Sequence, residues 1–181
     1  MSSGDTLVAE QGTSFFGASL VPLKSKMKFI GQPLWGSIGY TFPAMLGSQI
    51  ANPASRHLLF IGDGSLQLTI QELGMTFREK LTPIVFVINN DGYTVEREIH
   101  GPNELYNDIP MWDYQNLPYV FGGNKGNVAT YKVTTEEELV AAMSQARQDT
   151  TRLQWIEVVM GKQDSPDLLV QLGKVFAKQN S

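Results

Sequence analysis

The sequence predicts an α/β fold of three layers, in which helices cover both faces of a doubly wound, mainly parallel sheet. Two short apolar runs, 58–61 and 83–88, flank a helix-like segment at 67–80, which is the pattern of a βαβ unit with buried parallel strands. Candidate strands and helices alternate along all 181 residues. Because no internal repeat or low-complexity linker interrupts them, we expect residues 1–181 to form a single domain.

Each expected strand is a short run of apolar or β-branched residues. The first ends in the polar pair Glu10-Gln11, and the second is the weakest candidate. The third and fourth are the most apolar, which is typical of strands buried on both faces. We therefore expect strands at 6–10, 28–30, 56–61, 83–89, 128–133 and 153–159.

Helices are expected between these strands. The segment 35–50 is rich in small residues and predicts a buried helix that Pro43 kinks. Thr134-Thr135, followed by three glutamates, is typical of a helix N-terminus, and Ser165-Pro166-Asp167 starts a terminal helix. In chain order we expect a turn or helix at 12–17, helices at 35–50, 67–80 and 95–99, a single turn within 111–121, and helices at 135–148 and 166–178.

The composition excludes several classes of protein. Hydrophobic residues make up 42% of the chain and charged residues 18%, which is typical of a globular chain and not of a disordered one. A formal net charge of −4 without a cluster of basic residues argues against nucleic-acid binding. No apolar stretch approaches the roughly 20 residues of a membrane span. Since no signal peptide is visible and cysteine is absent, we expect a cytoplasmic protein without membrane contact.

Two polar motifs follow the two most apolar strands. Gly62-Asp63-Gly64-Ser65 ends the first, and Asn89-Asn90 ends the second, with 24 residues between Gly64 and Asn89. Because carboxyl ends of parallel strands share one edge of a sheet, both motifs should lie at a ligand-binding rim. Carboxylate and amide oxygens suit a hard divalent cation, and backbone N–H groups at a helix start suit a diphosphate. The sequence therefore predicts Mg²⁺ bridging a diphosphate at this rim.

Simpler interpretations of each motif alone remain open. An isolated Asp-Gly is more often an ordinary turn than a ligand site, and Asn89-Asn90 can also be a turn after a strand. No Gly-Lys-Ser/Thr follows, so the loop is not a Walker A loop, and the third glycine of a dinucleotide fingerprint is missing. Only the occurrence of both motifs one βαβ unit apart favours the diphosphate site.

At this point the chain resembles a known family. Asp63 and Asn90 fall in the spacing of the thiamine diphosphate motif, and the surrounding stretches extend the similarity to nearly the whole chain. The chain resembles the carboxy-terminal, diphosphate-binding domain of thiamine diphosphate-dependent 2-keto acid decarboxylases, closest to the branched-chain 2-keto acid and indolepyruvate decarboxylases. The stretches that carry this resemblance are 10–17, 31–44, 62–74 and 88–112.

The resemblance implies how the cofactor would be held. The Asp63 and Asn90 side chains and the Gly92 carbonyl would bind Mg²⁺, while Gly64 and Ser65 would hold the diphosphate. The implied cofactor-binding residues are Gly36, Ser37, Ile38, Gly62, Asp63, Gly64, Ser65, Asn90, Gly92, Tyr93, Thr94 and Val95.

The resemblance also implies residues for the reaction. Glu96 would sit beside the reacting carbon of the cofactor and transfer protons, and Ile38 would bend the cofactor from below. Taken alone, Ile38 is better explained as core and Glu96 as part of a solvated helix face, and the match around Glu96 reverses that preference for Glu96. Phe15, Phe16, Val95 and Leu172 would line a pocket for a branched-chain or aromatic 2-keto acid, or serve only in packing.

Members of the resembled family are much longer than 181 residues. The resemblance implies a pyrimidine-binding and a middle domain that we do not find here, and a homo-oligomer in which a glutamate of the pyrimidine-binding domain activates the cofactor. We therefore expect little or no decarboxylation to CO₂ and an aldehyde by this polypeptide alone. Two alternatives remain: a cofactor-binding or dimerisation module without turnover, and a domain of an acetolactate synthase-like carboligase.

Overall fold

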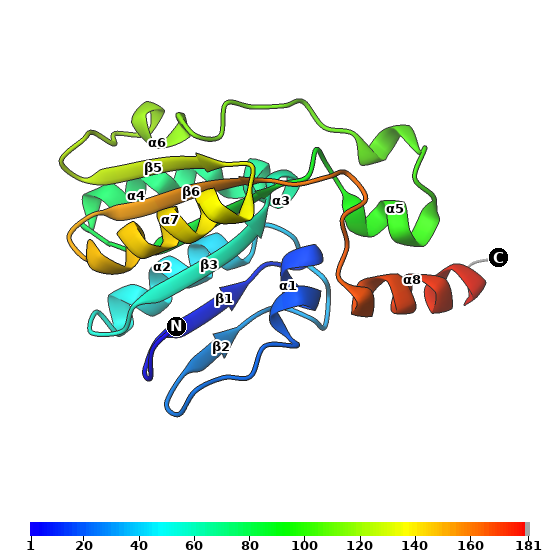
Figure 1. Ribbon diagram of the computed structural model, residues 1–181, viewed down its shortest axis with the longest axis horizontal. Coiled ribbons are helices and arrows are strands. Elements are labelled where there is room, and N and C mark those ends of the chain that lie inside the picture. The colour runs from blue at the N-terminus through cyan, green and yellow to red at the C-terminus, as the bar shows by residue number, and fades with distance from the viewer. Residues whose placement is uncertain (180–181) are drawn as a thin grey trace.

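The six predicted strands are confirmed and form one all-parallel sheet. The computed structural model, which describes residues 1–179, orders the strands β2-β1-β3-β4-β6-β5 (Figure 1). Their bounds are β1 (Thr6–Ala9), β2 (Lys28–Ile30), β3 (His57–Gly62), β4 (Ile84–Asn89), β5 (Val128–Val133) and β6 (Leu153–Val159).

The strand order reverses beside β1. The chain runs from β1 outward to β2, whereas β3 lies on the other side of β1 and continues to β4. The register places Ala9 of β1 beside Phe60 of β3, and Gly62 of β3 beside Ile88 of β4. The carboxyl ends of β1 and β3 therefore form a topological switch point, where open α/β sheets bind ligands.

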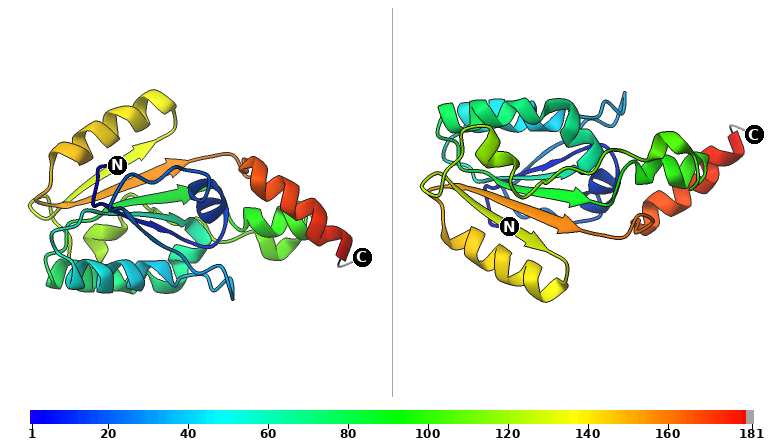
Figure 2. Two further views of the ribbon diagram at one scale, coloured as in Figure 1. Left: turned by 90° about the horizontal axis from the view of Figure 1, so that it is seen from below. Right: turned by 90° about the horizontal axis from the view of Figure 1, so that it is seen from above.

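Helices cover both faces of the sheet, as predicted. Figure 2 shows α7 on one side of the sheet and α2 with α4 on the other. Two further helices, α5 and α8, lie side by side beyond the carboxyl ends of the strands (Figures 1 and 2). The helices are α1 (Thr13–Ala18), α2 (Thr41–Ala51), α3 (Asp63–Thr69), η1 (Ile70–Glu72), α4 (Leu73–Arg78), α5 (Thr94–His100), η2 (Leu105–Asn107), α6 (Leu117–Val120), α7 (Glu136–Gln148) and α8 (Asp167–Gln179).

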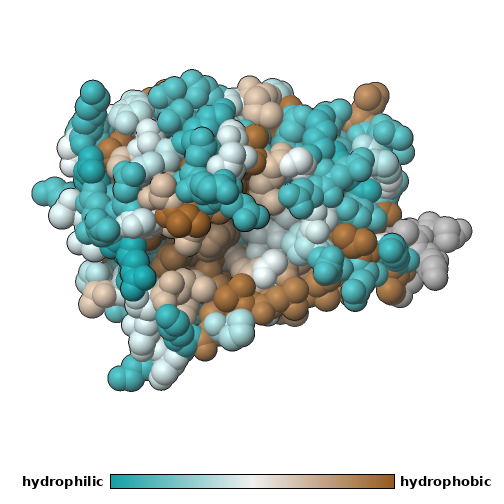
Figure 3. All heavy atoms as spheres, viewed as in Figure 1, coloured by the Kyte–Doolittle hydropathy of each residue, from teal (hydrophilic) through white to brown (hydrophobic). Residues whose placement is uncertain are grey.

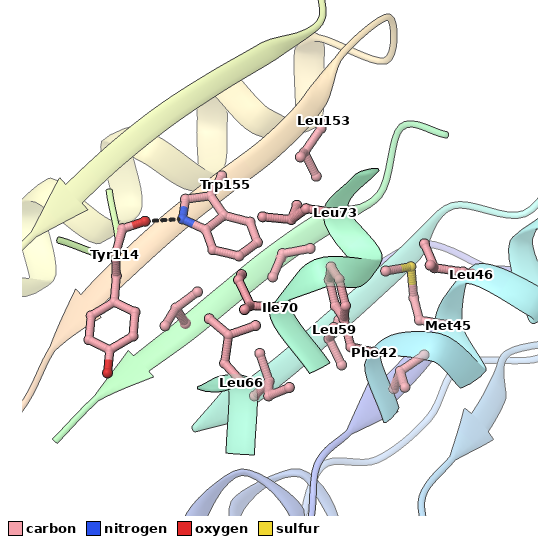
Figure 4. Close-up of a cluster of buried hydrophobic side chains, with 14 of the residues drawn as sticks. Phe42, Met45, Leu46, Leu59, Leu66, Ile70, Leu73, Tyr114, Leu153 and Trp155 are labelled. Atoms are coloured by element: carbon pink, nitrogen blue, oxygen red, sulfur yellow. Dashed lines mark hydrogen bonds between the residues drawn. The ribbon is translucent and has the colours of Figure 1, made fainter. Parts of the chain in front are cut away.

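The larger core lies between the sheet and α2, α3 and α4. Side chains that alternate along β3, β4 and β6 meet the apolar faces of these helices (Figure 4). Trp155 is fully buried there, and its indole Nε1 donates to the carbonyl of Tyr114 at 2.8 Å. This hydrogen bond holds the long connection after β4 against the sheet. The core packing also holds β1, β3 and β4 in place, so that the loops after these strands meet at one edge of the sheet.

Helix α2 begins later than predicted. The sequence predicted a helix over 35–50, but α2 starts at Thr41, whose N–H and hydroxyl donate to Glu10 Oε2 at 3.1 and 2.7 Å. The buried carboxylate that directly follows β1 thus binds the helix start, a tertiary contact that local pattern does not reveal. Pro43 falls in the first turn, where a backbone N–H has no partner within the helix, so it does not interrupt α2.

The opposite face of the sheet is covered less completely. Helix α7 packs Ala142 and Ala146 against this face, and its N-terminus carries the predicted cap, since Thr135 accepts from the N–H of Glu138 at 3.2 Å. Between α7 and the segment before β1 the surface is hollowed and partly apolar (Figure 3), and Leu58 and Phe86 line that hollow. No helix in the described part of the chain is both long and apolar enough to span a membrane.

Candidate functional site

A cavity of about 280 Å³ lies at the switch point of the sheet. The loops after β1, β3 and β4 and the connection before α2 supply its walls. Its lining residues are Gln11, Gly12, Thr13, Ser14, Gly36, Ile38, Gly62, Asp63, Gly64, Ser65, Asn90, Gly92, Tyr93, Thr94, Val95, Glu96 and Ile99.

Asp63 is a buried carboxylate at the wall of this cavity. Its Oδ1 accepts from the N–H of Gly64 at 2.8 Å, and its Oδ2 accepts from the N–H of Gly92 at 3.1 Å. Burial raises the pKa of Asp63 to about 6, against the opposing effect of these hydrogen bonds. Among residues 1–179 Asp63 makes no salt bridge, so its charge has only backbone dipoles to oppose it.

The loop after β4 approaches Asp63 closely. Asn90 is 3% exposed and shares the cavity wall with Asp63. Gly92 has φ +118, and a Cβ atom there would lie 2.1 Å from the carbonyl oxygen of Asn107. The neighbouring N–H of Tyr93 donates to that same oxygen at 2.9 Å. Only glycine therefore fits this loop as it is folded.

The start of α3 forms the second wall. The helix predicted over 67–80 is divided into α3, η1 and α4, and it starts earlier than expected, at Asp63 directly after β3. The first four residues of α3 are buried. A Cβ atom on Gly64 would lie 2.5 Å from the ring of Tyr93, which leaves room for backbone but for no side chain. The first residues of α3 line the cavity, and a helix start suits an anionic group.

Glu96 reaches the cavity from α5. Its Oε2 lies 2.9 Å from Nδ1 of His100, and its side chain is 40% exposed. The next residue, Arg97, is 5% exposed, so residues 96–98 are not solvated throughout, while Glu96 itself is partly exposed. Helix α5 therefore presents Glu96 to the cavity while Arg97 points into the protein.

The structure brings most of the predicted residues together. Every predicted cofactor-binding residue except Ser37 lines the cavity; the Ser37 hydroxyl instead accepts from Nε2 of Gln32 at 3.1 Å. Of the predicted substrate residues, Val95 lines the cavity. Phe15 packs edge-on against Phe16, and neither ring is among the lining residues. Leu172 is half-buried in α8 and is also not in the lining set.

Four lining residues after β1 were missed by the sequence reasoning. Gln11, Gly12, Thr13 and Ser14 contribute one wall, and Gln11 Oε1 and Ser14 Oγ are buried without a hydrogen-bond partner in the described residues. The sequence could have indicated these residues, because this polar segment follows a strand whose carboxyl end lies at the same edge of the sheet as the two motifs. The two oxygens are free to bind a polar ligand.

The donor set fits a hard cation with a diphosphate. Within the part of the chain that the structure describes, no cluster of three His, Cys, Asp or Glu residues occurs, so a thiolate or imidazole metal centre is not built here. Instead Asp63, Asn90 and Gly92 line the cavity together, and they can supply a carboxylate, a side-chain amide oxygen and a backbone carbonyl. Mg²⁺ accepts such oxygen donors when phosphate and water complete its shell. Gly62 and Gly64 line the cavity beside the start of α3 and place no side chain in it.

Fold and site define an α/β protein with a cavity at a sheet switch point, lined by residues that suit a cation and an anionic group. Residues 11–158 match the family described as thiamine pyrophosphate enzyme, C-terminal TPP binding domain. The chain therefore belongs to this family, and the predicted resemblance is confirmed.

Similar curated proteins carry the name alpha-keto-acid decarboxylase. The protein from Mycolicibacterium paratuberculosis is 46% identical over 172 residues, which are 95% of this chain and 30% of that protein. The protein from Mycobacterium tuberculosis is 45% identical over 179 residues, 99% of this chain and 32% of that protein. The chain thus spans about a third of the length of the curated relatives it matches.

Proposed function

We propose that this chain binds thiamine diphosphate and Mg²⁺ as the catalytic domain of a cytoplasmic, non-oxidative 2-keto acid decarboxylase that releases CO₂ and an aldehyde. The observation that carries the proposal is the buried Asp63 carboxylate, which faces a cavity without an ion-pair partner in residues 1–179. A divalent cation would supply the missing charge. The name shared by the relatives supports the reaction class.

The residues of the cavity have separate roles in this proposal. Asp63, Asn90 and the Gly92 carbonyl would hold Mg²⁺, and Gly64 with Ser65 at the start of α3 would bind the diphosphate. Gly62, Ser37, Tyr93 and Thr94 would shape the cofactor site, with the Gly36 carbonyl orienting the pyrimidine amino group and Ile38 supporting the cofactor from below.

Glu96 is the proposed catalytic residue. It is the carboxyl group on α5 that lines the cavity, where it would donate and accept protons beside the reacting carbon. Bound thiamine diphosphate supplies the electron sink for decarboxylation, and the protein supplies position and proton transfer. Val95 lines the same cavity, and with Phe15, Phe16 and Leu172 we propose that it selects a branched-chain or aromatic side chain of the 2-keto acid.

Calorimetric titration of the 181-residue polypeptide tests the cofactor assignment. We expect saturable binding of thiamine diphosphate that requires Mg²⁺, and no binding of NAD or ATP. Measured release of CO₂ from 2-keto acids should be negligible, because the resemblance places the cofactor-activating glutamate on a pyrimidine-binding domain. Binding that is independent of Mg²⁺, or enzyme-like turnover by this polypeptide alone, would contradict the proposal.

A second prediction concerns the rim of the cavity. Leu34 and Trp35, which precede the lining residue Gly36, are 90% and 87% exposed. Large exposed apolar side chains next to a ligand site mark an interaction surface. We therefore propose that the complete enzyme is a homo-oligomer whose pyrimidine-binding domain covers this rim, and we expect the polypeptide alone to self-associate.

Sedimentation velocity checks this expectation. Trp35→Ser should shift the polypeptide towards monomer, while Val120→Ser, at a position on α6 that is 76% exposed and away from the cavity, should leave the distribution unchanged. A sharp monomer peak for the unaltered polypeptide at high concentration would be evidence against the interface.

A further inference from the structure

Arg97 is a buried arginine behind the loop that carries the proposed cation ligands. Its side chain is 3% exposed, whereas arginine is almost never fully buried without partners. Nη2 donates to the carbonyls of Asp91 and Asn107 at 2.6 and 3.2 Å and to Asp108 Oδ1 at 2.9 Å. Nη1 donates to the carbonyl of Asn90 at 3.5 Å. One guanidinium thus joins two consecutive loop carbonyls to the segment around Asn107.

Lys162, in the segment after β6, holds the same loop from the outside. Its Nζ lies 2.7 Å from Asp91 Oδ2 and 3.3 Å from Asp108 Oδ1. Its carbonyl accepts from the hydroxyl of Thr94 at 2.8 Å and from Arg97 Nη1 at 3.5 Å. Lys162 therefore contacts both ends of the loop, one through its side chain and the other through its backbone.

The loop needs such restraint because its backbone is strained. Asp91 has φ +58 and Gly92 has φ +118, and a non-glycine residue rarely adopts a positive φ without compensating contacts. This conformation is the one that brings the N–H of Gly92 to Asp63 Oδ2. Without the contacts of Arg97 and Lys162 the loop would relax towards ordinary backbone angles.

We propose that Arg97 and Lys162 form an ionic clamp that fixes residues 90–94 in the cation-binding conformation before a ligand arrives. Arg97 is then a positioning residue for the metal site. The inference rests on the proposed function, since it takes Asp63, Asn90 and Gly92 as cation ligands. Preorganised ligands lose less conformational freedom on binding, so the clamp raises cation affinity.

The clamp also distributes the charges around the site. Its two cations face Asp91 and Asp108, which leaves Asp63 as the cavity carboxylate without an ion pair in the described residues. An entering cation therefore meets an unpaired carboxylate. Because Arg97 is next to Glu96 on α5, the same contacts orient the helix that presents Glu96 to the cavity.

Binding of Mn²⁺, measured by the electron paramagnetic resonance of the free ion in the presence of thiamine diphosphate, tests the clamp on the full polypeptide. Arg97→Met should weaken Mn²⁺ binding at least tenfold, and Lys162→Met several-fold. Arg97→Lys should recover only part of the loss, because an ammonium cannot reach both loop carbonyls and Asp108 at once. Arg78→Met is the matched control, since Arg78 pairs only with its neighbour Glu79 in the described residues, and should bind as the unaltered chain does.

Hydrogen exchange of the ligand-free chain gives a second readout that does not depend on the cofactor. The amides of Gly92 and Tyr93, which bond to Asp63 and Asn107, should exchange faster in both clamp variants and at the unaltered rate in Arg78→Met. Unchanged exchange and unchanged Mn²⁺ affinity in Lys162→Met would overturn the clamp even if Arg97→Met fails to fold. If the unaltered chain binds no Mn²⁺, the proposed function fails and the positioning role with it, whatever the exchange rates show.

Discussion

Asp63→Asn is expected to weaken Mg²⁺-dependent binding of thiamine diphosphate by about 100-fold or more, which corresponds to roughly 2.7 kcal/mol. The substitution keeps the size of the side chain but removes the charge that faces the cavity, and a neutral amide is a much poorer ligand for a hard cation. Calorimetric titration with and without Mg²⁺ measures the effect. Asp113→Asn, at an exposed position, is the control and should bind as the unaltered chain does.

The same substitution should change the pH dependence of stability in the absence of cofactor. Burial raises the pKa of Asp63 to about 6 from its ordinary value of 3.8, so the folded chain binds this proton more tightly than the unfolded chain. The contribution of Asp63 to stability is therefore most favourable below about pH 4 and is lost as the pH rises to about 6. The loss is about 3 kcal/mol at about 1.4 kcal/mol per pKa unit.

Denaturant unfolding between pH 4 and 7 isolates this contribution as the difference between the unaltered chain and Asp63→Asn. The curve of the variant should lack the decline that Asp63 causes, while Asp113→Asn should retain it. Parallel curves for the unaltered chain and Asp63→Asn, together with unchanged cofactor binding, would return Asp63 to the simple interpretation of an Asp-Gly turn.

Local pattern was sufficient for most of the fold. The apolar runs at 58–61 and 83–88 lie in the adjacent parallel strands β3 and β4, and Thr135 caps α7 as predicted, in a capping box with Glu138. The failures occur where a distant residue decides the local structure. Helix α2 starts at Thr41 because Glu10, 31 residues earlier, binds its first N–H. No periodicity within 35–50 encodes that contact.

The candidate site likewise contains residues that local pattern predicts and residues that it does not. Asp63 and Asn90 were predicted because each follows a strand, and the parallel arrangement then brings both to one edge. Arg97 was not predicted, because its neighbours Glu96 and Glu98 give it the pattern of a solvated face. Its burial follows from the carbonyls that the loop before α5 turns towards it. The sequence around a residue gives little indication of its burial when its partners are backbone atoms of other segments.

The largest effect on the loop itself is expected from Gly92→Ala. The added Cβ would lie 2.1 Å from the carbonyl oxygen of Asn107 and 3.0 Å from Nη2 of Arg97, and φ is +118. A backbone atom cannot move aside as a flexible side chain can, so the loop must refold. We expect the free energy of unfolding to fall by about 3 kcal/mol or more, and the melting temperature by roughly 6–12 °C.

Alanine substitutions at two further glycines separate the steric and the backbone contributions to the stability lost in Gly92→Ala. Gly101 has φ +115 but no atom within 4 Å of its virtual Cβ, so Gly101→Ala measures the backbone strain alone, about 1–3 kcal/mol. Gly47 lies inside α2 with open space around it. Gly47→Ala should therefore stabilise the protein by up to about 1 kcal/mol. If Gly92→Ala is destabilised more than Gly101→Ala and also loses Mg²⁺-dependent binding, then contact with Asn107 determines the shape of the cation loop. Equal losses of stability in Gly92→Ala and Gly101→Ala would show that the positive φ alone causes the effect. The close approach of Asn107 would then play no part in shaping the site.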